Sequence, residues 1–169
     1  TISYQKNENA SETYLYMYSN ITIKSITQNN IPLKYSIDGE ILTIHKSKKP
    51  DQDFSSFPIT IDYSLTPITG SFQGFYSYYG CYFTKFEPNY ARMLLPCFDE
   101  PIVKSTFSIK LKIPSNLIAL SNMPSESTTI TDNEKEITFM QTPPMCTYLV
   151  AIFIGLFDFI EGTTKRGLP

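Results

Sequence analysis

The sequence predicts an all-β domain of short antiparallel strands, interrupted by a single helical turn. In two stretches, 59–65 and 107–113, apolar side chains alternate with polar ones. This alternation is typical of strands that have one face in the core and the other in water. The chain of 169 residues has 12 Tyr, 12 Phe and no Trp, and strands favour Tyr and Phe. No segment carries a helical apolar stripe longer than about two turns.

Turn residues place two hairpins. Asp38-Gly39 separates the segments 33–37 and 40–44. Because Asp-Gly accepts positive φ angles, this pair predicts a tight type I′ turn. A second turn is expected at Asp132-Asn133, leading into a strand over 136–140.

The remaining strands follow from apolar runs and breaks. The segment 14–26 should form one or two strands, with Ser19-Asn20 as the break. The run 149–154 is apolar on both faces, which predicts a central strand of a sheet. Segment 46–56 is polar and is expected to be a loop.

The helical turn is expected near residues 88–95. Pro88 suits the first position of a helix, because its missing N–H would have no partner there. Pro96 disfavours a helical conformation at Leu95 and should end the turn.

Composition limits the classes of function. The length fits one domain with a hydrophobic core, and a net charge of −2 gives no reason to expect a nucleic acid or anionic membrane partner. The longest apolar run, 148–157, is shorter than the roughly 20 residues that span a bilayer. The polar segment 1–10 does not have the pattern of a signal peptide, but this says little about the parent protein. We expect a cytoplasmic location and leave a secreted or membrane-anchored parent open. The triplets Asn9-Ala10-Ser11 and Asn20-Ile21-Thr22 are interpreted as chance matches to glycosylation sites.

Cysteine and histidine usage argues against a metal site in this chain. Cys81, Cys97 and Cys146 are odd in number and lack C-x-x-C spacing, which indicates buried free thiols. His45 is the single histidine and is expected to be solvated at the end of a strand. A catalytic zinc site needs several His or carboxylate ligands on one face, so this chain alone is not a complete enzyme.

The segment 84–107 departs from the alternation elsewhere, and such departures are typical of functional sites. Glu87 precedes the predicted helical turn, where its carboxylate could cap the helix or pair with Arg92. Alternatively, it points into a cleft and binds a cation. Asp99 and Glu100 are expected to pin the loop through a fork-shaped pair with Arg92.

This segment resembles a family signature. The blocks Thr84-Lys85-Phe86-Glu87-Pro88, Ala91-Arg92 and Pro96-Cys97-Phe98-Asp99-Glu100-Pro101 are similar to the N-terminal domain of gluzincin aminopeptidases, of the puromycin-sensitive and aminopeptidase N type. Further similar blocks cover most of the chain, at 74–77, 104–107, 119–124, 142–149 and 153–155.

The resemblance implies a curved, saddle-like antiparallel β-sandwich that packs on a thermolysin-like catalytic domain. It places the N-terminal β domain at 1–163, with the first strands missing, and the start of a linker to the absent catalytic domain at 164–169. Zinc would be bound by that catalytic domain in the parent enzyme, and this chain alone would be inactive. The implied partners are peptide N-termini and the catalytic domain, with no nucleic acid and no membrane span.

The resemblance also assigns two substrate-binding residues. Glu87 would hold the α-ammonium group of the substrate, together with a glutamate of the absent domain. Lys85 stands where many relatives have Gln or His, at the pocket for the first side chain. It either turns to solvent, which a long lysine stem allows, or it adapts the pocket to acidic or polar residues.

Three alternatives stay open. The leukotriene hydrolase branch of the family usually has Gln at the position of Glu87, so Glu87 argues against it. A non-catalytic relative could serve as a protein-interaction scaffold. A free-standing β-sandwich binding module is the third.

Overall fold

The structure, a computed structural model, describes residues 12–45, 58–158, 160, 162–165 and 167. Within these residues every pairing between strands is antiparallel, as predicted. No helix of this part of the chain is long and apolar enough to cross a bilayer.

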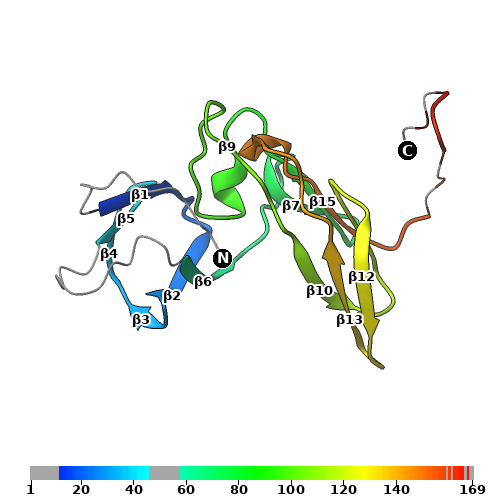
Figure 1. Ribbon diagram of the computed structural model, residues 1–169, viewed down its shortest axis with the longest axis horizontal. Helices are drawn as coiled ribbons and strands as arrows, with labels where there is room; N and C mark the ends of the chain where they lie inside the picture. Colours follow the sequence, from blue (N-terminus) through cyan, green and yellow to red (C-terminus); the bar gives the residue numbers. More distant parts are fainter. Residues whose placement is uncertain (1–11, 46–57, 159, 161, 166, 168–169) are drawn as a thin grey trace.

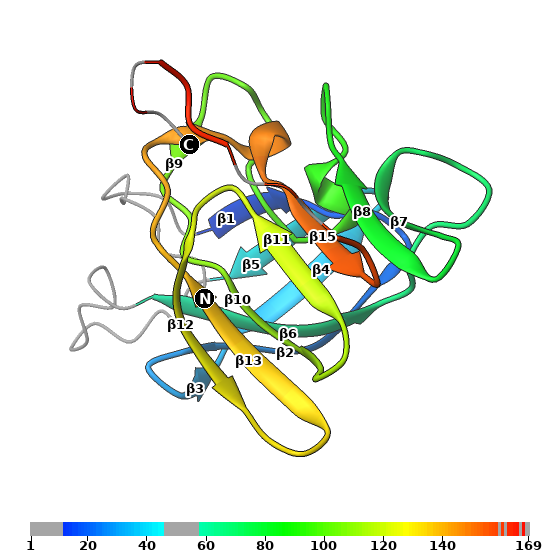
Figure 2. The same ribbon diagram turned by 90° about the vertical axis from the view of Figure 1, so that its right-hand side faces the viewer.

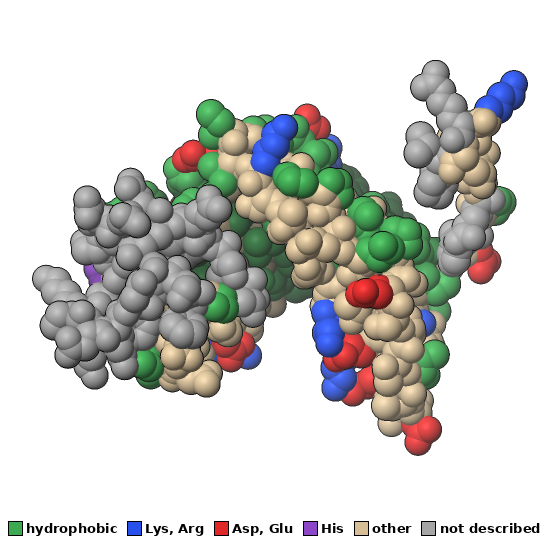
Figure 3. All heavy atoms as spheres, viewed as in Figure 1, with side chains coloured by type: hydrophobic (Ala, Val, Ile, Leu, Met, Phe, Trp, Pro, Cys, Tyr) green, Lys and Arg blue, Asp and Glu red, His purple; other side chains and the backbone are tan. Residues whose placement is uncertain are grey.

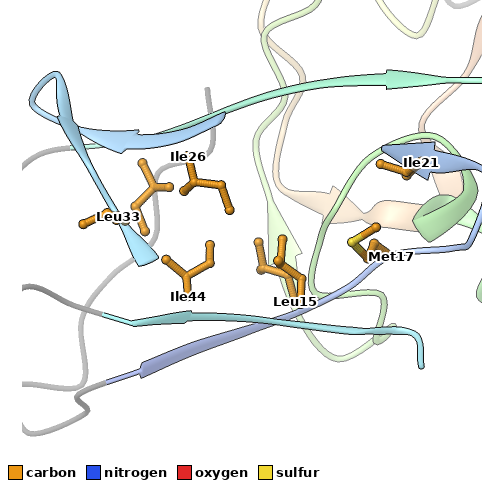
Figure 4. Close-up of a cluster of buried hydrophobic side chains, with 8 residues drawn as sticks. Leu15, Met17, Ile21, Ile26, Leu33 and Ile44 are labelled. Atoms are coloured by element: carbon orange, nitrogen blue, oxygen red, sulfur yellow. The ribbon is translucent and has the colours of Figure 1, made fainter. Parts of the chain in front are cut away.

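The amino-terminal lobe is a small sandwich of two three-stranded sheets, with orders β1-β5-β4 and β3-β2-β6. Buried aliphatic side chains from both sheets fill the space between them (Figure 4). This lobe contains β1 (Glu12–Tyr16), β2 (Ile21–Gln28), β3 (Ile31–Pro32), β4 (Lys34–Asp38), β5 (Ile41–His45) and β6 (Ile59–Leu65).

The carboxy-terminal lobe combines a four-stranded sheet, β11-β15-β8-β7, with a three-stranded sheet, β10-β13-β12 (Figure 2). Its core is a second cluster, formed by Ile113, Ala119, Ile137 and Phe139. This lobe contains β7 (Gly74–Tyr78), β8 (Cys81–Lys85), β10 (Lys110–Pro114), β11 (Ile118–Ser121), β12 (Ser125–Ile130), β13 (Glu134–Phe139) and β15 (Ile152–Gly155).

A junction connects the two lobes at the top of an arch (Figure 1). Figure 3 shows the hollow beneath the arch, where charged side chains of the carboxy-terminal lobe gather. The junction contains two short 3₁₀ helices, η2 (Ala91–Met93) and η3 (Thr147–Leu149), and a two-stranded sheet of β9 (Lys104–Ser105) and β14 (Met145–Cys146). The predicted all-β, saddle-like architecture is therefore confirmed.

The first hairpin is present, but its turn lies one residue further along. Asp38 pairs with Ile41, so Gly39 and Glu40 are the two loop residues. Only Gly39 has positive φ, at 57°, which fits a type II′ turn and not the predicted type I′. Burial of Leu42 fixes this register, because a slip by one residue would turn it to solvent.

Two strands have other bounds than predicted. At the hairpin of Asp132-Asn133 the strand β13 begins two residues earlier than expected, at Glu134. The strand predicted over 107–113 begins only at Lys110. Phe107 instead pairs with Thr142, whose hydroxyl accepts the N–H of Phe107 at 3.0 Å. The N–H of Met140 donates to the Pro124 carbonyl at 3.0 Å, so the ladder with β13 ends before this point.

The other predicted strands are confirmed in outline. A break at Ser19-Asn20 separates β1 from β2, and β15 is an inner strand of its sheet, although it is shorter than 149–154 because residues 147–149 form η3. The Asn20 amide nitrogen donates to the carbonyls of Thr66 (3.0 Å) and Met93 (2.9 Å), which agrees with a structural role and not glycosylation. Asn9 and the loop predicted at 46–56 lie outside the described residues.

Titration of Tyr63 on β6 should make the free energy of unfolding depend on pH in alkaline solution. Burial raises the pKa of Tyr63 from 10.0 to about 12. The unfolded chain therefore loses the phenolic proton at a lower pH than the folded chain, so the free energy of unfolding should fall as the pH rises above about 10. Urea unfolding between about pH 8 and pH 11 should show a smaller fall for Tyr63→Phe. An identical pH dependence of the two proteins would contradict this expectation.

Candidate functional site

The site lies on the loop that follows β8, and Phe86 anchors it. Phe86 is 1% exposed and belongs to the junction core with Ala91, Cys97 and Val150. In an extended chain, neighbouring side chains point to opposite sides. Burial of Phe86 therefore turns Lys85 and Glu87 outward, and both are exposed.

The helical turn after Glu87 is present but shorter than predicted. Its helical part is η2, Ala91–Met93, and the chain leaves it before Pro96 as expected. The expectation for Pro88 was wrong, because this residue lies in the turn before the helix, after a cis peptide bond with Glu87. The N–H of Tyr90 donates to the Phe86 carbonyl at 2.7 Å, so residues 87–89 form a closed loop outside the helix.

Arg92 fixes this loop to the rest of the junction. Its Nε donates to Asp99 Oδ2 at 2.9 Å, and its Nη1 donates to Glu40 Oε2 at 2.7 Å. The guanidinium carbon lies 4.3 Å from the centroid of the Tyr16 ring, within the range of a cation–π contact. Asp99 also accepts hydrogen bonds from the Arg92 backbone N–H (3.3 Å) and the Thr147 hydroxyl (3.3 Å).

Arg92 pairs with Asp99 as predicted, but through the single side-chain nitrogen Nε and not as a fork, and the role expected for Glu100 was wrong. Glu100 accepts a hydrogen bond from the Tyr16 hydroxyl at 3.2 Å, and the second carboxylate on Arg92 is Glu40. Glu40 is 52 positions from Arg92 in sequence, and no local pattern could have indicated the contact.

These carboxylates stabilise the charged guanidinium. Burial lowers the pKa of Arg92, but the hydrogen bonds to Asp99 and Glu40 outweigh it, so the net shift is upward. Each carboxylate is hydrogen-bonded to a different nitrogen of the guanidinium, which restricts its rotation. The loop that carries Glu87 is thus held from one side by Phe86 and from the other by Arg92.

The structure excludes both structural roles considered for Glu87, which are capping the helix and pairing with Arg92. The residue before η2 is Tyr90, no side chain caps the helix, and its first turn contains no acid. Arg92 is occupied by Asp99 and Glu40. Within the part of the chain that the structure describes, the Glu87 carboxylate has no hydrogen bond and no ion pair.

Lys85 ends β8 on a sheet face covered by aromatic side chains. We define the aromatic face as Phe72, Tyr76, Tyr78, Phe83 and Phe153. Their ring centroids form a chain of contacts between 5.5 and 5.8 Å. Phe72 is 59% exposed and Tyr78 51%, and the chain carries no charged side chain between Asp62 and Lys85. Exposed apolar patches of this kind mark interaction surfaces.

The cysteines and the histidine contribute no described metal site. No three side chains of His, Cys, Asp or Glu come together in residues 12–45 and 58–158. All three cysteines are free, as predicted, with Cys97 and Cys146 buried and Cys81 partly buried. His45 does end a strand, but its Nδ1 lies 2.9 Å from Glu12 Oε1 and it is not merely solvated.

The structure is a two-lobed antiparallel β domain, in which an exposed glutamate without a partner among the described residues lies on an anchored loop. The Peptidase M1 N-terminal domain family matches residues 2–149, and the chain belongs to this family. The resemblance to the gluzincin aminopeptidases is thereby confirmed.

Named relatives are aminopeptidases. Over 85 residues the chain is 48% identical to aminopeptidase M1 of Arabidopsis thaliana, which covers 50% of this chain and 10% of that protein. Over 87 residues it is 46% identical to the puromycin-sensitive aminopeptidase of Caenorhabditis elegans (50% and 9%) and 47% identical to glutamyl aminopeptidase of Mus musculus (51% and 9%). The matched segment thus spans about a tenth of each relative.

Solved structures show the same fold. The M1 zinc metallopeptidase from Deinococcus radiodurans superposes with a TM-score of 0.75 at 20% identity, over 86% of this chain and 34% of that one. A mutant of the same enzyme bound to a Tyr-Ser-Ala substrate gives a TM-score of 0.74, with the same identity and coverage.

Proposed function

We propose that this chain is the N-terminal β domain of a zinc aminopeptidase that removes single residues from peptide N-termini. Within that enzyme, Glu87 provides a carboxylate for the α-ammonium group of the substrate. The observation that carries the proposal is the exposed carboxylate of Glu87, without a partner among the described residues, on a loop anchored by Phe86 and Arg92.

The chemistry of N-terminal recognition needs such a group. An α-ammonium group offers three N–H donors and a positive charge, whereas an internal amide offers one N–H donor and no charge. A carboxylate enclosed in the cleft binds the ammonium group and is left unpaired by an acylated terminus, which costs free energy. A loop fixed by its own packing holds the carboxylate in place before the substrate arrives.

The aromatic face supports packing on a catalytic domain. Enrichment in Tyr and Phe with few charged residues is typical of the centre of protein–protein interfaces. Lys85 lies on the same face as Phe83, two residues earlier on β8. A catalytic domain that covered this face would therefore come close to Lys85 and Glu87.

Zinc belongs to another part of the proposed enzyme. The structural neighbours are zinc metallopeptidases by name, but the described residues of this chain bring no set of ligands together. We therefore propose that zinc is bound outside this chain and that the chain alone is inactive. A cytoplasmic location stays a prediction.

A second function is favoured by one observation. The aromatic face could serve a non-catalytic family member as a protein-interaction scaffold, because such a surface needs no chemistry to bind a partner. In that case Glu87 would have no substrate.

Hydrolysis of fluorogenic aminoacyl substrates by the full-length protein distinguishes the two functions. Cleavage that a zinc chelator abolishes and added zinc restores is expected for the aminopeptidase, and this chain alone should show none. A folded, zinc-loaded full-length protein that cleaves no aminoacyl substrate would favour the scaffold.

Lys85 gives a prediction about specificity. Because Lys85 is exposed two positions from Glu87, the lysine can favour acidic first residues. An exposed ion pair contributes up to about 1 kcal/mol, or roughly fivefold in rate. Lys85→Gln should raise kcat/KM for neutral relative to acidic first residues by about this factor. An unchanged ratio would mean that Lys85 turns to solvent.

A further inference from the structure

The guanidinium of Arg92 lies where the two lobes meet, and its two carboxylate partners come from opposite directions. Asp99 follows η2 in the junction and its side chain is 1% exposed. Glu40 comes from the turn between β4 and β5 of the amino-terminal lobe and its side chain is 46% exposed. Removal of Glu40 would leave Nη1 without a carboxylate, and the guanidinium would keep only Asp99 at Nε and the Tyr16 ring at its face.

Backbone hydrogen bonds connect the same segments. The N–H of Tyr18 donates to the Arg92 carbonyl at 3.0 Å, and the N–H of Met17 donates to the Glu40 carbonyl at 2.9 Å. The segment after β1 thus holds both the main chain of Arg92 and the turn that presents Glu40. This fixes the distance between them and allows a short contact of 2.7 Å between their side chains.

A short stretch of chain, closed by a hydrogen bond, connects Arg92 to Glu87. Arg92 is in the single turn of η2, and the hydrogen bond from Tyr90 to Phe86 closes the loop of residues 87–89 against that helix. Loss of a carboxylate partner would let the Arg92 side chain reorient, and η2 would pass this change to the base of the loop. In that case the position of the Glu87 carboxylate would depend on both carboxylate partners of Arg92.

We propose that Glu40 is a positioning residue for Glu87 and acts through Arg92. This inference rests on the proposed function of Glu87 as the ammonium-binding carboxylate. Glu40 itself touches no substrate. It completes the hold on Arg92, which keeps the loop of Glu87 in the orientation that fits an α-ammonium group.

The test uses the full-length protein and a pair of competitive inhibitors. Leucine hydroxamate carries the α-ammonium group, and 4-methylpentanoyl hydroxamate has the same chain and metal-binding group without the amine. The ratio of their inhibition constants reports the ammonium site alone, because metal affinity and the fraction of folded protein cancel. Glu40→Gln should reduce the preference for the amine by about three- to tenfold, since the neutral amide loses the charge-assisted part of the contact.

Glu134→Gln is the matched control. Glu134 forms an ion pair of the same length, 2.7 Å, with Lys112, and is 53% exposed, but it lies on β13 in the other lobe. This control should leave the ratio of the two inhibition constants unchanged. A loss equal to that of Glu40→Gln would overturn the proposal.

A double-mutant cycle separates the inference from the function on which it rests. Glu87→Gln alone should remove most of the preference for the amine, and adding Glu40→Gln to it should remove little more. If Glu87→Gln has no effect, both the proposed function and the inference are wrong. If Glu87→Gln acts but Glu40→Gln does not, or if the two effects multiply, Glu87 binds the amine and only the role of Glu40 is wrong.

Discussion

Replacement of Glu87 by alanine should lower kcat/KM of the full-length protein for peptides with a free amino terminus by about 10- to 150-fold. A hydrogen bond to a charged group contributes about 1.5–3 kcal/mol, which corresponds to this range. The effect should fall mainly on KM if the ammonium contact is equal in the ground and transition states, and also on kcat if it orients the scissile bond. Steady-state kinetics with aminoacyl substrates measure both.

Glu126→Ala is a suitable control for Glu87→Ala. Glu126 is also an exposed glutamate, but it lies on β12 in the carboxy-terminal lobe, away from the junction. Its removal should leave kcat/KM within about twofold, as for a surface substitution. A kcat/KM for Glu87→Ala that equals the control would exclude an ammonium site at this position.

Replacement of Asp99 by alanine should lower the free energy of unfolding by about 3–5 kcal/mol, because it breaks a buried ion pair from one side. Arg92 is only 14% exposed and would keep Glu40 as its single carboxylate. The backbone N–H of Arg92 and the hydroxyl of Thr147 would lose their acceptor as well. Such a loss is a large part of the roughly 5–15 kcal/mol that stabilises a domain. Urea unfolding of the unchanged protein and of Asp99→Ala measures this difference in the free energy of unfolding.

The neighbouring acid provides the comparison for Asp99. Glu100 is exposed and accepts one hydrogen bond, from the Tyr16 hydroxyl. Glu100→Ala should therefore cost less than about 1 kcal/mol. If Asp99→Ala and Glu100→Ala unfold at the same urea concentration, the buried pair does not stabilise the junction as described.

Local sequence patterns predicted those strands whose position depends mainly on neighbouring residues. Alternation over 59–65 gave β6, and Gly39 marked the first hairpin. The start of β10 could not be predicted, because Phe107 pairs with the distant Thr142 and the ladder with β13 ends before this point. Pro88 fits the first position of a helix by local rules, yet the loop closed by Tyr90 and Phe86 holds it outside.

The site divides in the same way between local and distant contacts. The pair of Arg92 with Asp99 joins residues seven positions apart, and the sequence predicted it. The contact with Glu40 depends on the folded amino-terminal lobe and was missed. For Glu87 the sequence left a cap, an ion pair and a cation site open, and its assignment as a binding residue came from the family resemblance. The structure removes the first two of these roles.

The separate cores of the two lobes have a consequence for cooperativity. Each lobe buries its own cluster of apolar side chains, and the junction between them depends on a small core, backbone hydrogen bonds and the contacts of Arg92. Segments with independent cores can open one at a time, each with its own free energy. Amide hydrogens of β2 and β13 should therefore exchange in two distinct opening events, and the strength of the junction determines how closely the two events coincide.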